Sequence, residues 1–279
     1  MDEIVVKSPA KINIGLNIIS KREDGFHNLE TIFYPLNLFD EIRFNKSKNF
    51  SFNSNDENLN KETTNLIIRA KELLENEFGI SILVDVFLHK NIPIGAGLGG
   101  GSSNAASTLT SLIKLFDLKI EKDHLANLAL KLGSDVPYFL NPVPCFAESR
   151  GEILIPVNLK LDKYILVVNP GIHVATKWAF GLIKPKMTVY SLKSLISKSK
   201  IEIEEVMRLA SNDFEKIVFE HFPEIKEIKR RMLHFGAKHC MMTGTGSTVW
   251  ALFEDKEAAY QTELYFKCKN YFIFIQKPT

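Results

Sequence analysis

The residues with the clearest chemical potential lie in one stretch, which reads IPIGAGLGGGSSNAAS from Ile92 to Ser107. Five glycines fall within seven residues, and two serines and an asparagine follow them directly. Glycine tolerates positive φ and lets bare backbone approach a ligand closely, so such a cluster indicates a binding loop. If a helix starts here, its free N–H groups and its dipole favour an anion such as a phosphate chain.

The elements around this loop are predicted from the spacing of apolar residues. After the loop, they recur at i, i+4, i+7, i+8 and i+11, which predicts an amphipathic helix over 105–116. Ser102 or Ser103 is the expected N-cap of that helix. Before the loop, the run from Ile82 to His89 predicts a strand. A flexible glycine-serine linker lacks such flanks, so we interpret the stretch as a structured loop.

The loop matches parts of several known motifs. From Gly95 to Gly100 it reads G-x-G-x-x-G, the dinucleotide fingerprint, but no second strand ending in an acid about 20 residues further on follows the helix. A Walker A loop needs a lysine after its last glycine, whereas Gly101 precedes Ser102. The H-R-D and D-F-G motifs of protein kinases do not occur in the sequence. These differences favour a phosphate loop of another type and leave a dinucleotide oxidoreductase as the rival class.

Composition limits the partners and the compartment. The chain has 279 residues with 35 basic and 33 acidic side chains, and a net charge of +2 gives no reason to expect nucleic acid as a partner. Cys145, Cys240 and Cys268 lack C-x-x-C spacing, as expected for reduced thiols. The sequence has no secretory signal and no run of 18 apolar residues, so we expect a cytoplasmic protein without a membrane partner. We expect a monomer or a weak homodimer that binds a small molecule.

The N-terminal half is expected to mix strands and helices. Residues 4–6 and 12–19 have the composition and alternation of strands, with Lys11 at the bend between them. The polar segment 46–61 is expected to be a surface loop or an edge. Apolar spacing then predicts a helix over 65–78.

A second helix is predicted over 123–132, ended by Gly133. Asp135 follows at the expected start of a short helix. An acid in that place can cap the helix, or it can serve as a carboxylate fixed in space that accepts a proton. The residues alone leave both roles open.

The C-terminal half predicts a second layered domain. A hairpin is expected around Arg150-Gly151, and two helices over 212–235 are expected to be broken at Pro223. Strand, strand, helix and strand patterns follow over 239–275, which with the preceding helix is the order of a ferredoxin-like split βαβ layer. The basic, serine-rich stretch 184–200 is expected to be a solvated face.

Three stretches together resemble the motifs of the GHMP small-molecule kinases, a family that includes galactokinase, homoserine kinase and mevalonate kinase. They are SPAKIN from Ser8, PIGAGLGGGSS from Pro93 and MTGTGS from Met242. The resemblance implies an α+β fold of two domains, a mixed α/β ATP-binding domain over 1–157 and a ferredoxin-like domain over 158–279, with an active-site cleft between them. It also implies ATP as the phosphoryl donor, with Mg²⁺.

The resemblance implies roles for individual residues. Lys11 and Asp135 would be the catalytic pair, Lys11 orienting the carboxylate and Asp135 accepting the proton of a substrate hydroxyl. Ser102 or Ser103 would touch the metal, and no acidic side chain is assigned as its ligand. The residues expected to contact ATP are Asn65, Lys90, Pro93, Gly95, Gly97, Gly99, Gly100, Gly101, Ser102, Ser103 and Asn104. For Asn65 a helix cap, and for Lys90 a charge at a strand end, remain equal alternatives.

Within the family, two segments resemble those of the kinases in the non-mevalonate isoprenoid pathway, whose substrate carries a cytidine. They are Gly25-Phe26-His27 and the segment from Leu132 to Pro137. Phe26 stands where many of those relatives have tyrosine. Phe180 is either a platform for the base or a core residue. The residues expected to contact the substrate are Asn13, Phe26, His27, Thr176, Phe180, Gly244, Thr245 and Gly246. Another small-alcohol kinase of the family, or a nucleotide-binding module without transfer activity, remains an alternative.

Overall fold

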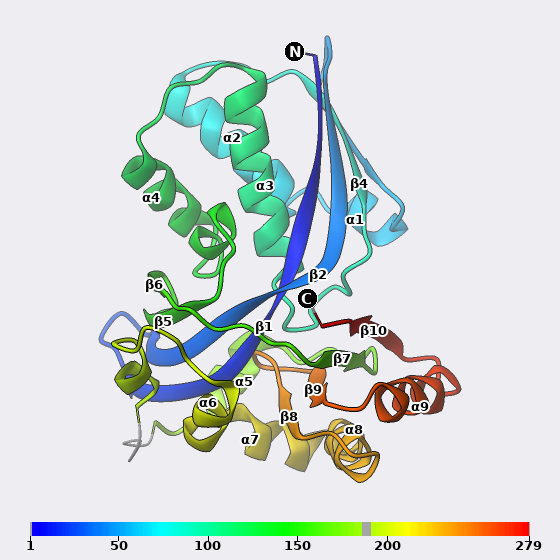
Figure 1. Cartoon of the computed structure of the whole chain (residues 1–279). Coiled ribbons are helices and arrows are strands. Elements are labelled where there is room, and N and C mark those ends of the chain that lie inside the picture. Colours follow the sequence, from blue (N-terminus) through cyan, green and yellow to red (C-terminus); the bar gives the residue numbers. More distant parts are fainter. Residues whose placement is uncertain (1, 186–190, 279) are drawn as a thin grey trace. The chain divides into compact units, whose positions relative to one another are not determined.

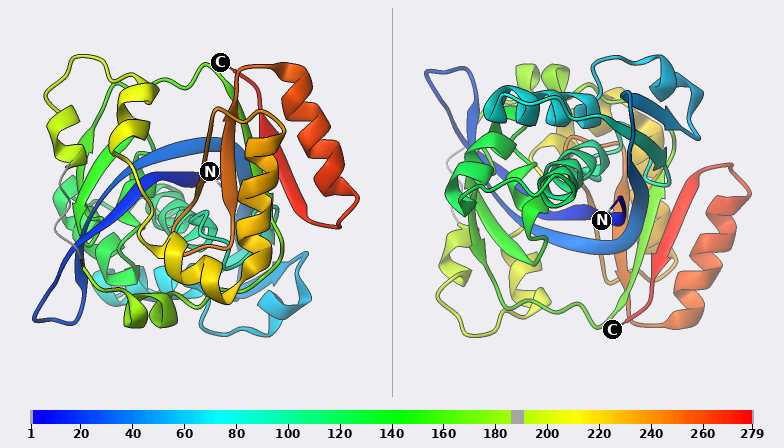
Figure 2. Two further views of the ribbon diagram at one scale, coloured as in Figure 1. Left: turned by 90° about the horizontal axis from the view of Figure 1, so that it is seen from below. Right: turned by 90° about the horizontal axis from the view of Figure 1, so that it is seen from above.

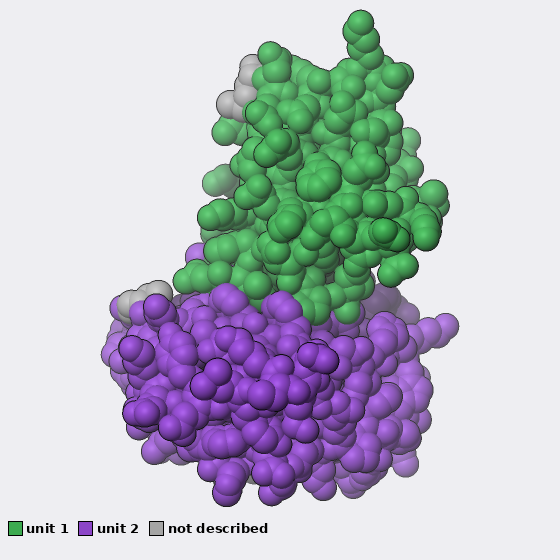
Figure 3. Space-filling model, turned by 90° about the vertical axis from the view of Figure 1, so that its right-hand side faces the viewer, with its two compact units in different colours: residues 1–10, 37–94, 99–142 green, residues 11–36, 95–98, 143–279 purple. Residues whose placement is uncertain are grey.

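The fold is described from a computed structural model, in which residues 2–185 and 191–278 are described (Figure 1). The chain divides into two compact units (Figure 3): unit 1 comprises residues 1–10, 37–94 and 99–142, and unit 2 comprises residues 11–36, 95–98 and 143–279. Two short segments of the N-terminal half therefore belong to unit 2. The domain limits at residues 157 and 158 remain a prediction.

Unit 1 combines strands with a layer of helices. Strand β4 (Val84–His89) pairs antiparallel with residues 41–46 of β2 (His27–Lys46) and parallel with β3 (Ser51–Ser54). Helix α3 packs against its neighbours α2, α4 and η1. The bounds of the helices are α1 Glu57–Lys61, α2 Leu66–Phe78, α3 Gly100–Leu115, α4 Lys122–Leu132 and η1 Pro137–Leu140. The expected helices over 65–78, 105–116 and 123–132 are thus confirmed. The segment 46–61, expected to be a surface loop or an edge, contains the edge strand β3 and the short helix α1.

Unit 2 contains a four-stranded antiparallel sheet in the order β10-β7-β9-β8. Helices α8 and α9 pack on it (Figure 2). The chain order β7, α8, β8, β9, α9, β10 with this strand order is the ferredoxin-like arrangement, so the predicted layer is confirmed. Its bounds are β7 Tyr164–Asn169, α8 Pro223–His234, β8 His239–Met242, β9 Val249–Phe253, α9 Lys256–Lys267 and β10 Phe272–Gln276.

The rest of unit 2 surrounds that layer. The predicted hairpin is present as antiparallel β5 and β6, and β5 pairs with residues 29–33 of β2. Helix α7 ends just before Pro223, where α8 begins, so the predicted break is confirmed. The remaining bounds are β5 Cys145–Ser149, β6 Ile153–Pro156, α5 Thr176–Leu182, η2 Leu192–Leu195, α6 Ile203–Leu209 and α7 Phe214–His221.

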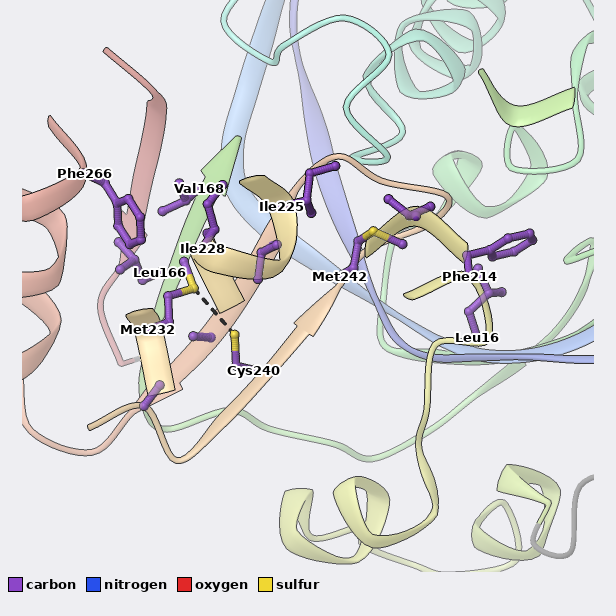
Figure 4. Packing of buried hydrophobic residues seen from close by; sticks show 14 of the residues in the cluster. Leu16, Leu166, Val168, Phe214, Ile225, Ile228, Met232, Cys240, Met242 and Phe266 are labelled. Carbon is purple, nitrogen blue, oxygen red and sulfur yellow. Dashed lines mark hydrogen bonds between the residues drawn. The ribbon is translucent and has the colours of Figure 1, made fainter. Parts of the chain in front are cut away.

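A hydrophobic cluster holds unit 2 together (Figure 4). Residues from β7, α8, β8 and α9 meet in it, among them Leu166, Ile228 and Phe266. The Cys240 thiol lies 3.6 Å from the Met232 sulfur, and burial raises the pKa of that thiol. Cys145, Cys240 and Cys268 are all free, as expected.

Strand β1 (Glu3–Lys21) differs from its prediction, because it is continuous over 19 residues. The bend expected at Lys11 is wrong, and Lys11 lies inside the strand. Proline fits extended backbone where its missing N–H is not needed. Pro9 lies within β1, two residues before Lys11.

The basic stretch 184–200 lies partly outside the described residues, which omit 186–190. In the part that is described, Leu192 and Leu195 of η2 are buried. This part is therefore anchored by apolar side chains and is not a purely solvated face, in contrast to the prediction.

Candidate active site

The glycine loop and the start of α3 form the first part of the candidate site. Gly95, Gly97 and Gly99 have φ of 66°, 77° and 75°, a region that favours glycine. Gly99 is the N-cap of α3, and among the described residues no side chain caps this helix end. The N-cap predicted at Ser102 or Ser103 is wrong, because Gly100 and Gly101 already have helical backbone. The uncapped N–H groups of this first turn suit an anionic ligand.

Close neighbours explain why several of these positions are glycine. A Cβ on Gly97 would lie 2.4 Å from the Thr243 carbonyl oxygen, and one on Gly95 would lie 2.9 Å from Nδ1 of His173. On Gly101, by contrast, a Cβ would make only an ordinary 3.5 Å contact with Leu66. Packing within the chain therefore accounts for Gly97 but not for Gly101.

Asp40 fixes the entry to the loop. Its side chain is fully buried and pairs with the Lys90 ammonium, while its other carboxylate oxygen accepts the N–H groups of Asn91 and Ile92, each at 2.8 Å. Burial lowers the pKa of Lys90 from its ordinary value, and the Asp40 charge opposes that shift. Lys90 is thus a buried, paired charge at the end of β4. Asp40 was missed by sequence reasoning because it lies 50 residues before Lys90.

The serines and Asn104 of α3 differ in their surroundings. Ser103 is fully buried, and its hydroxyl accepts a hydrogen bond from Ser8 at 2.9 Å, while Ser107 donates to Ser8 at 3.1 Å. Ser102 is only half-buried. Asn104 is 3% exposed, and its Oδ1 has no hydrogen-bond partner among the described residues. Ser103 is therefore engaged inside unit 1, and Ser102 is the better candidate for a ligand contact.

Two predicted residues lie at the ends of other elements of unit 1. Asn65 is the N-cap of α2, with its Oδ1 accepting the N–H groups of Ile67 and Ile68 at 3.0 and 3.1 Å. Asp135 is half-buried in the turn that follows Gly133. Helix η1 begins at Pro137 with Val136 as its N-cap, so Asp135 stands one residue before the cap, and both roles considered for it remain predictions.

Lys11 lies in a buried polar network of unit 2. Its ammonium donates to Oδ1 of Asn13 at 2.6 Å and to the Gly97 carbonyl at 3.1 Å, and it lies 5.2 Å from the centroid of the Phe33 ring. The Lys11 N–H donates to the carbonyl of Leu98 at 2.9 Å. The structure thus brings Lys11 and Asn13 together with the unit 2 part of the glycine loop.

Thr243 joins the third motif to this network. Its hydroxyl accepts the N–H of Asn13 at 2.9 Å and lies 3.1 Å from Asn13 Oδ1 and 3.2 Å from the Gly97 carbonyl. Trp250 on β9 donates its indole N–H to the Asn13 carbonyl at 3.0 Å. Sequence reasoning missed Thr243 and Trp250 as site residues, although Thr243 stands within the motif that drew attention to its neighbours.

The turn from Gly244 to Gly246 is held from the side of α7. The Asn212 amide donates to the carbonyl oxygens of Met242 and Gly244 at 2.8 and 2.9 Å. Thr245 is buried, and its hydroxyl lies 3.4 Å from that of Thr176 on α5. Two of the predicted substrate contacts, Thr176 and Thr245, are therefore neighbours.

The aromatic residues predicted for substrate binding make ring contacts within unit 2. The His27 and Phe180 rings lie 5.3 Å apart, and Phe180 also packs against Phe214 at 4.8 Å. Burial lowers the pKa of His27, and the nearby charge of Lys21 acts in the same direction. Phe26 is 47% exposed, with the Arg150 guanidinium 3.7 Å from its ring centroid. Phe180 is thus partly a core residue, while one ring face of Phe26 is occupied by a cation.

The predicted catalytic pair is divided between the units, with Lys11 in unit 2 and Asp135 in unit 1, so their pairing remains a prediction.

Within residues 2–185 and 191–278, no group of three or more His, Cys, Asp or Glu side chains could hold a metal ion. Every helix in the same residues is too short or too polar to cross a membrane.

Two family models and several named proteins match this chain. Residues 65–141 match the family model of the GHMP kinases N terminal domain, and residues 191–271 match that of the GHMP kinases C terminal domain. A Bacteroides fragilis protein named 4-diphosphocytidyl-2-C-methyl-D-erythritol kinase is 44% identical over 91% of this chain and 97% of its own length. A protein of the same name from Chlorobium phaeobacteroides is 37% identical over 96% of this chain and 95% of its own length.

Solved structures lead to the same family. A crystal structure of 4-(cytidine 5'-diphospho)-2C-methyl-D-erythritol kinase superposes with a TM-score of 0.81 at 30% identity, covering 98% of each chain. Homoserine kinase from Cytophaga hutchinsonii shares the fold, with a TM-score of 0.72 at 18% identity over 100% of this chain and 95% of the other. The relatives cover both units described above. The chain belongs to the GHMP kinase family.

Proposed function

We propose that this chain transfers the γ-phosphoryl group of ATP to the 2-hydroxyl of 4-diphosphocytidyl-2-C-methyl-D-erythritol, a step of the non-mevalonate isoprenoid pathway. The observation that carries the proposal is the identity of 37% and 44% with kinases of that name from two organisms, over more than nine tenths of this chain. The glycine loop lies within residues 65–141, which match the model of the GHMP kinases N terminal domain.

The triphosphate of ATP would bind at the first turn of α3. This turn has no side-chain cap, so its N–H groups are available to phosphate oxygens. Gly101 is exposed, and packing within the chain does not require glycine there. A glycine at this place lets the phosphate chain approach the backbone closely.

Lys11 and Asp135 would act on the acceptor hydroxyl. The hydroxyl oxygen bonds to the γ-phosphorus, the bond from that phosphorus to the β–γ bridging oxygen breaks, and ADP leaves with the bonding electron pair. The hydroxyl proton passes to the Asp135 carboxylate, and the Lys11 ammonium stabilises the negative charge of the oxygen as that proton leaves. Because the transition state of phosphoryl transfer is loose, a late proton acceptor is sufficient.

Bound Mg²⁺ would neutralise charge on the β- and γ-phosphates. The half-buried Ser102 hydroxyl fits a contact to a metal carried by ATP, whereas Ser103 is engaged with Ser8. The described residues provide no carboxylate cluster for a resident metal, so we assign the ion to the nucleotide.

The cytidine end of the substrate would lie against His27 and the exposed Phe26, with Phe180 behind His27. Phe26 has no phenol hydroxyl, so its contribution is limited to ring contact. We also infer a monomer or a weak homodimer in the cytoplasm. The free thiols are consistent with that reducing compartment.

The proposal is tested by incubating the full chain with MgATP and the cytidine-linked substrate and following the reaction by ³¹P NMR. We expect one new phosphomonoester signal and one equivalent of ADP, with the diphosphate bridge to cytidine intact. Cleavage of that bridge, or ATP binding without a new phosphomonoester, would contradict the proposal.

A further inference from the structure

A chain of hydrogen bonds leads from a buried threonine on β2 to the Lys11 ammonium on β1. Thr31 is fully buried, and its hydroxyl lies 2.5 Å from the Gly15 carbonyl oxygen and 3.0 Å from Nδ2 of Asn13. At the other end of the same amide, Oδ1 of Asn13 lies 2.6 Å from the Lys11 ammonium. All four residues belong to unit 2.

The available protons fix the direction in which this series of hydrogen bonds runs. A carbonyl oxygen cannot donate, so the single proton of the Thr31 hydroxyl is used on Gly15. Thr31 can then only accept from Asn13, and this requires the NH₂ end of the amide to face it. The carbonyl end of Asn13 consequently faces Lys11.

The opposite orientation of Asn13 would be costly. Its NH₂ group would face the Lys11 ammonium, donor against donor, and its carbonyl would face a threonine oxygen whose proton is already used. A buried donor or acceptor without a partner is strongly unfavourable. Asn13 is 3% exposed and Lys11 is 3% exposed, so water offers little compensation.

We propose that Thr31 is a positioning residue for phosphoryl transfer, acting through the Asn13 amide to hold the Lys11 ammonium in its place beside the Gly97 carbonyl. Thr31 itself touches neither ATP nor the acceptor in this scheme. The inference rests on the role proposed above for Lys11. It assigns a function to a residue for which no motif in the sequence gives a signal.

The test compares kcat of the full chain with that of Thr31→Val, which keeps the shape of the side chain and removes the hydroxyl. We expect kcat to fall on the order of tenfold or more, as small displacements of a reacting group do, with KM for ATP within about twofold of the original. Thr31→Ser keeps the hydroxyl and is expected to retain most of kcat. Thr31→Ala serves as a second deletion if the valine variant folds poorly.

Thr262→Val is the matched control. Thr262 is also fully buried in unit 2, and its hydroxyl donates to the Ala258 carbonyl at 2.7 Å on α9, outside the network. A kcat loss that reflects general loosening of unit 2 would appear in this variant too. Thermal unfolding of each variant separates reduced stability from reduced turnover.

The double variant Thr31→Val with Lys11→Ala shows whether the effect passes through Lys11. If it does, adding Thr31→Val to Lys11→Ala causes no further loss of residual kcat. If the two losses of kcat multiply in the double variant, this inference is wrong. It is also wrong if Thr31→Val has an unchanged kcat while Lys11→Ala is impaired. Either result would leave the role proposed for Lys11 in place. Full activity of Lys11→Ala would overturn the role proposed for Lys11, and this inference with it.

Discussion

Proton acceptance by Asp135 is the first property to be tested at the scale of single residues. Asp135→Asn keeps the size of the side chain and removes its basicity. We expect kcat to fall by about 10² to 10⁴ while ATP binding stays nearly unchanged, because the nucleotide contacts are assigned to other residues. Steady-state kinetics with equilibrium binding of ATP measures both. A variant with normal kcat would show that Asp135 is not the proton acceptor.

Gly97 is expected to be essential for packing before any ligand binds. A Cβ there would lie 2.4 Å from a backbone oxygen, and φ is +77°. We expect Gly97→Ala to lower the free energy of unfolding by about 1 to 2 kcal/mol through the positive φ and by a further 1 to 3 kcal/mol, roughly, through the clash.

Gly171→Ala is the control for that experiment. Gly171 also has a φ of +77°, but an added Cβ would meet nothing within 4 Å. Only the first of the two costs applies to it, and chemical denaturation measures the difference. Equal destabilisation of the two variants would mean that the loop adapts to a side chain at Gly97.

A functional residue could be predicted from the sequence where it stands in a short motif, but not where it acts through a long-range contact. Lys11 and the glycines stand in short motifs, so their positions drew attention without a structure. Thr31, Asp40 and Asn212 act through partners that strand pairing and packing bring near, such as Met242, 30 residues after Asn212. No local pattern encodes these contacts, and the motif could not show that Thr243 is hydrogen-bonded to Asn13.

At the scale of elements, the N-terminus of α2 offers a way to separate structure from function. Asn65→Ala removes a side-chain cap, and we expect about 0.5 to 2 kcal/mol of destabilisation. Asn65→Ser restores a capping oxygen and should restore most of that stability. If Asn65 also contacts ATP through its amide, KM for ATP rises in both variants.

Stability and KM are read on the same preparations of Asn65 variants. A KM that recovers in Asn65→Ser along with stability would assign Asn65 to capping alone. Unchanged stability in Asn65→Ala would contradict the capping geometry itself.

The predicted elements are mostly confirmed where hydrophobic spacing or a proline defines them, as for α2, α4 and the break at Pro223. The errors lie where residue types allow two conformations. Pro9 can continue a strand as well as bend it, so β1 was predicted in two pieces. Gly100 and Gly101 can enter a helix as well as a loop, so the N-cap of α3 was placed three to four residues too late.

At the scale of the whole molecule, stability is expected to depend on pH through two histidines, the buried His27 and the half-buried His239. Burial lowers the pKa of His239 and His27 below the ordinary 6.5, and the charges of Lys163 and Lys238 also lower that of His239, against Glu204 and Glu254. Nε2 of His239 is buried, with no hydrogen-bond partner among the described residues. Protonation of either ring therefore favours the unfolded chain.

The direction of this pH dependence follows from the number of protons that the folded and unfolded states bind. Below about pH 6.5 the unfolded chain binds more protons than the folded one, so stability is lost as pH falls through that region. We expect the urea midpoint to decrease from about pH 7.5 to about pH 5.5. His239→Gln should reduce this decrease, whereas the same change at the exposed His89 should not. A midpoint that rises on acidification would contradict the assignment.

The division into units could not be predicted from local patterns. Residues 11–36 and 95–98 belong by contact to the C-terminal part of the chain, because β1, β2 and the glycine loop contribute to both units. The ferredoxin-like layer was predictable, since its elements follow one another in sequence. That Lys11 from unit 2 and Asp135 from unit 1 act on one substrate is a proposal.

The central claim is the choice of substrate, and steady-state ADP release by the full chain with MgATP tests it most directly. The acceptors to compare are 4-diphosphocytidyl-2-C-methyl-D-erythritol, mevalonate, phosphomevalonate, homoserine and galactose. We predict turnover with the first and none with the others. Turnover only with another alcohol would contradict the claim, removing the cytidine roles of Phe26, His27 and Phe180 while leaving the glycine loop, Lys11 and Asp135 in place.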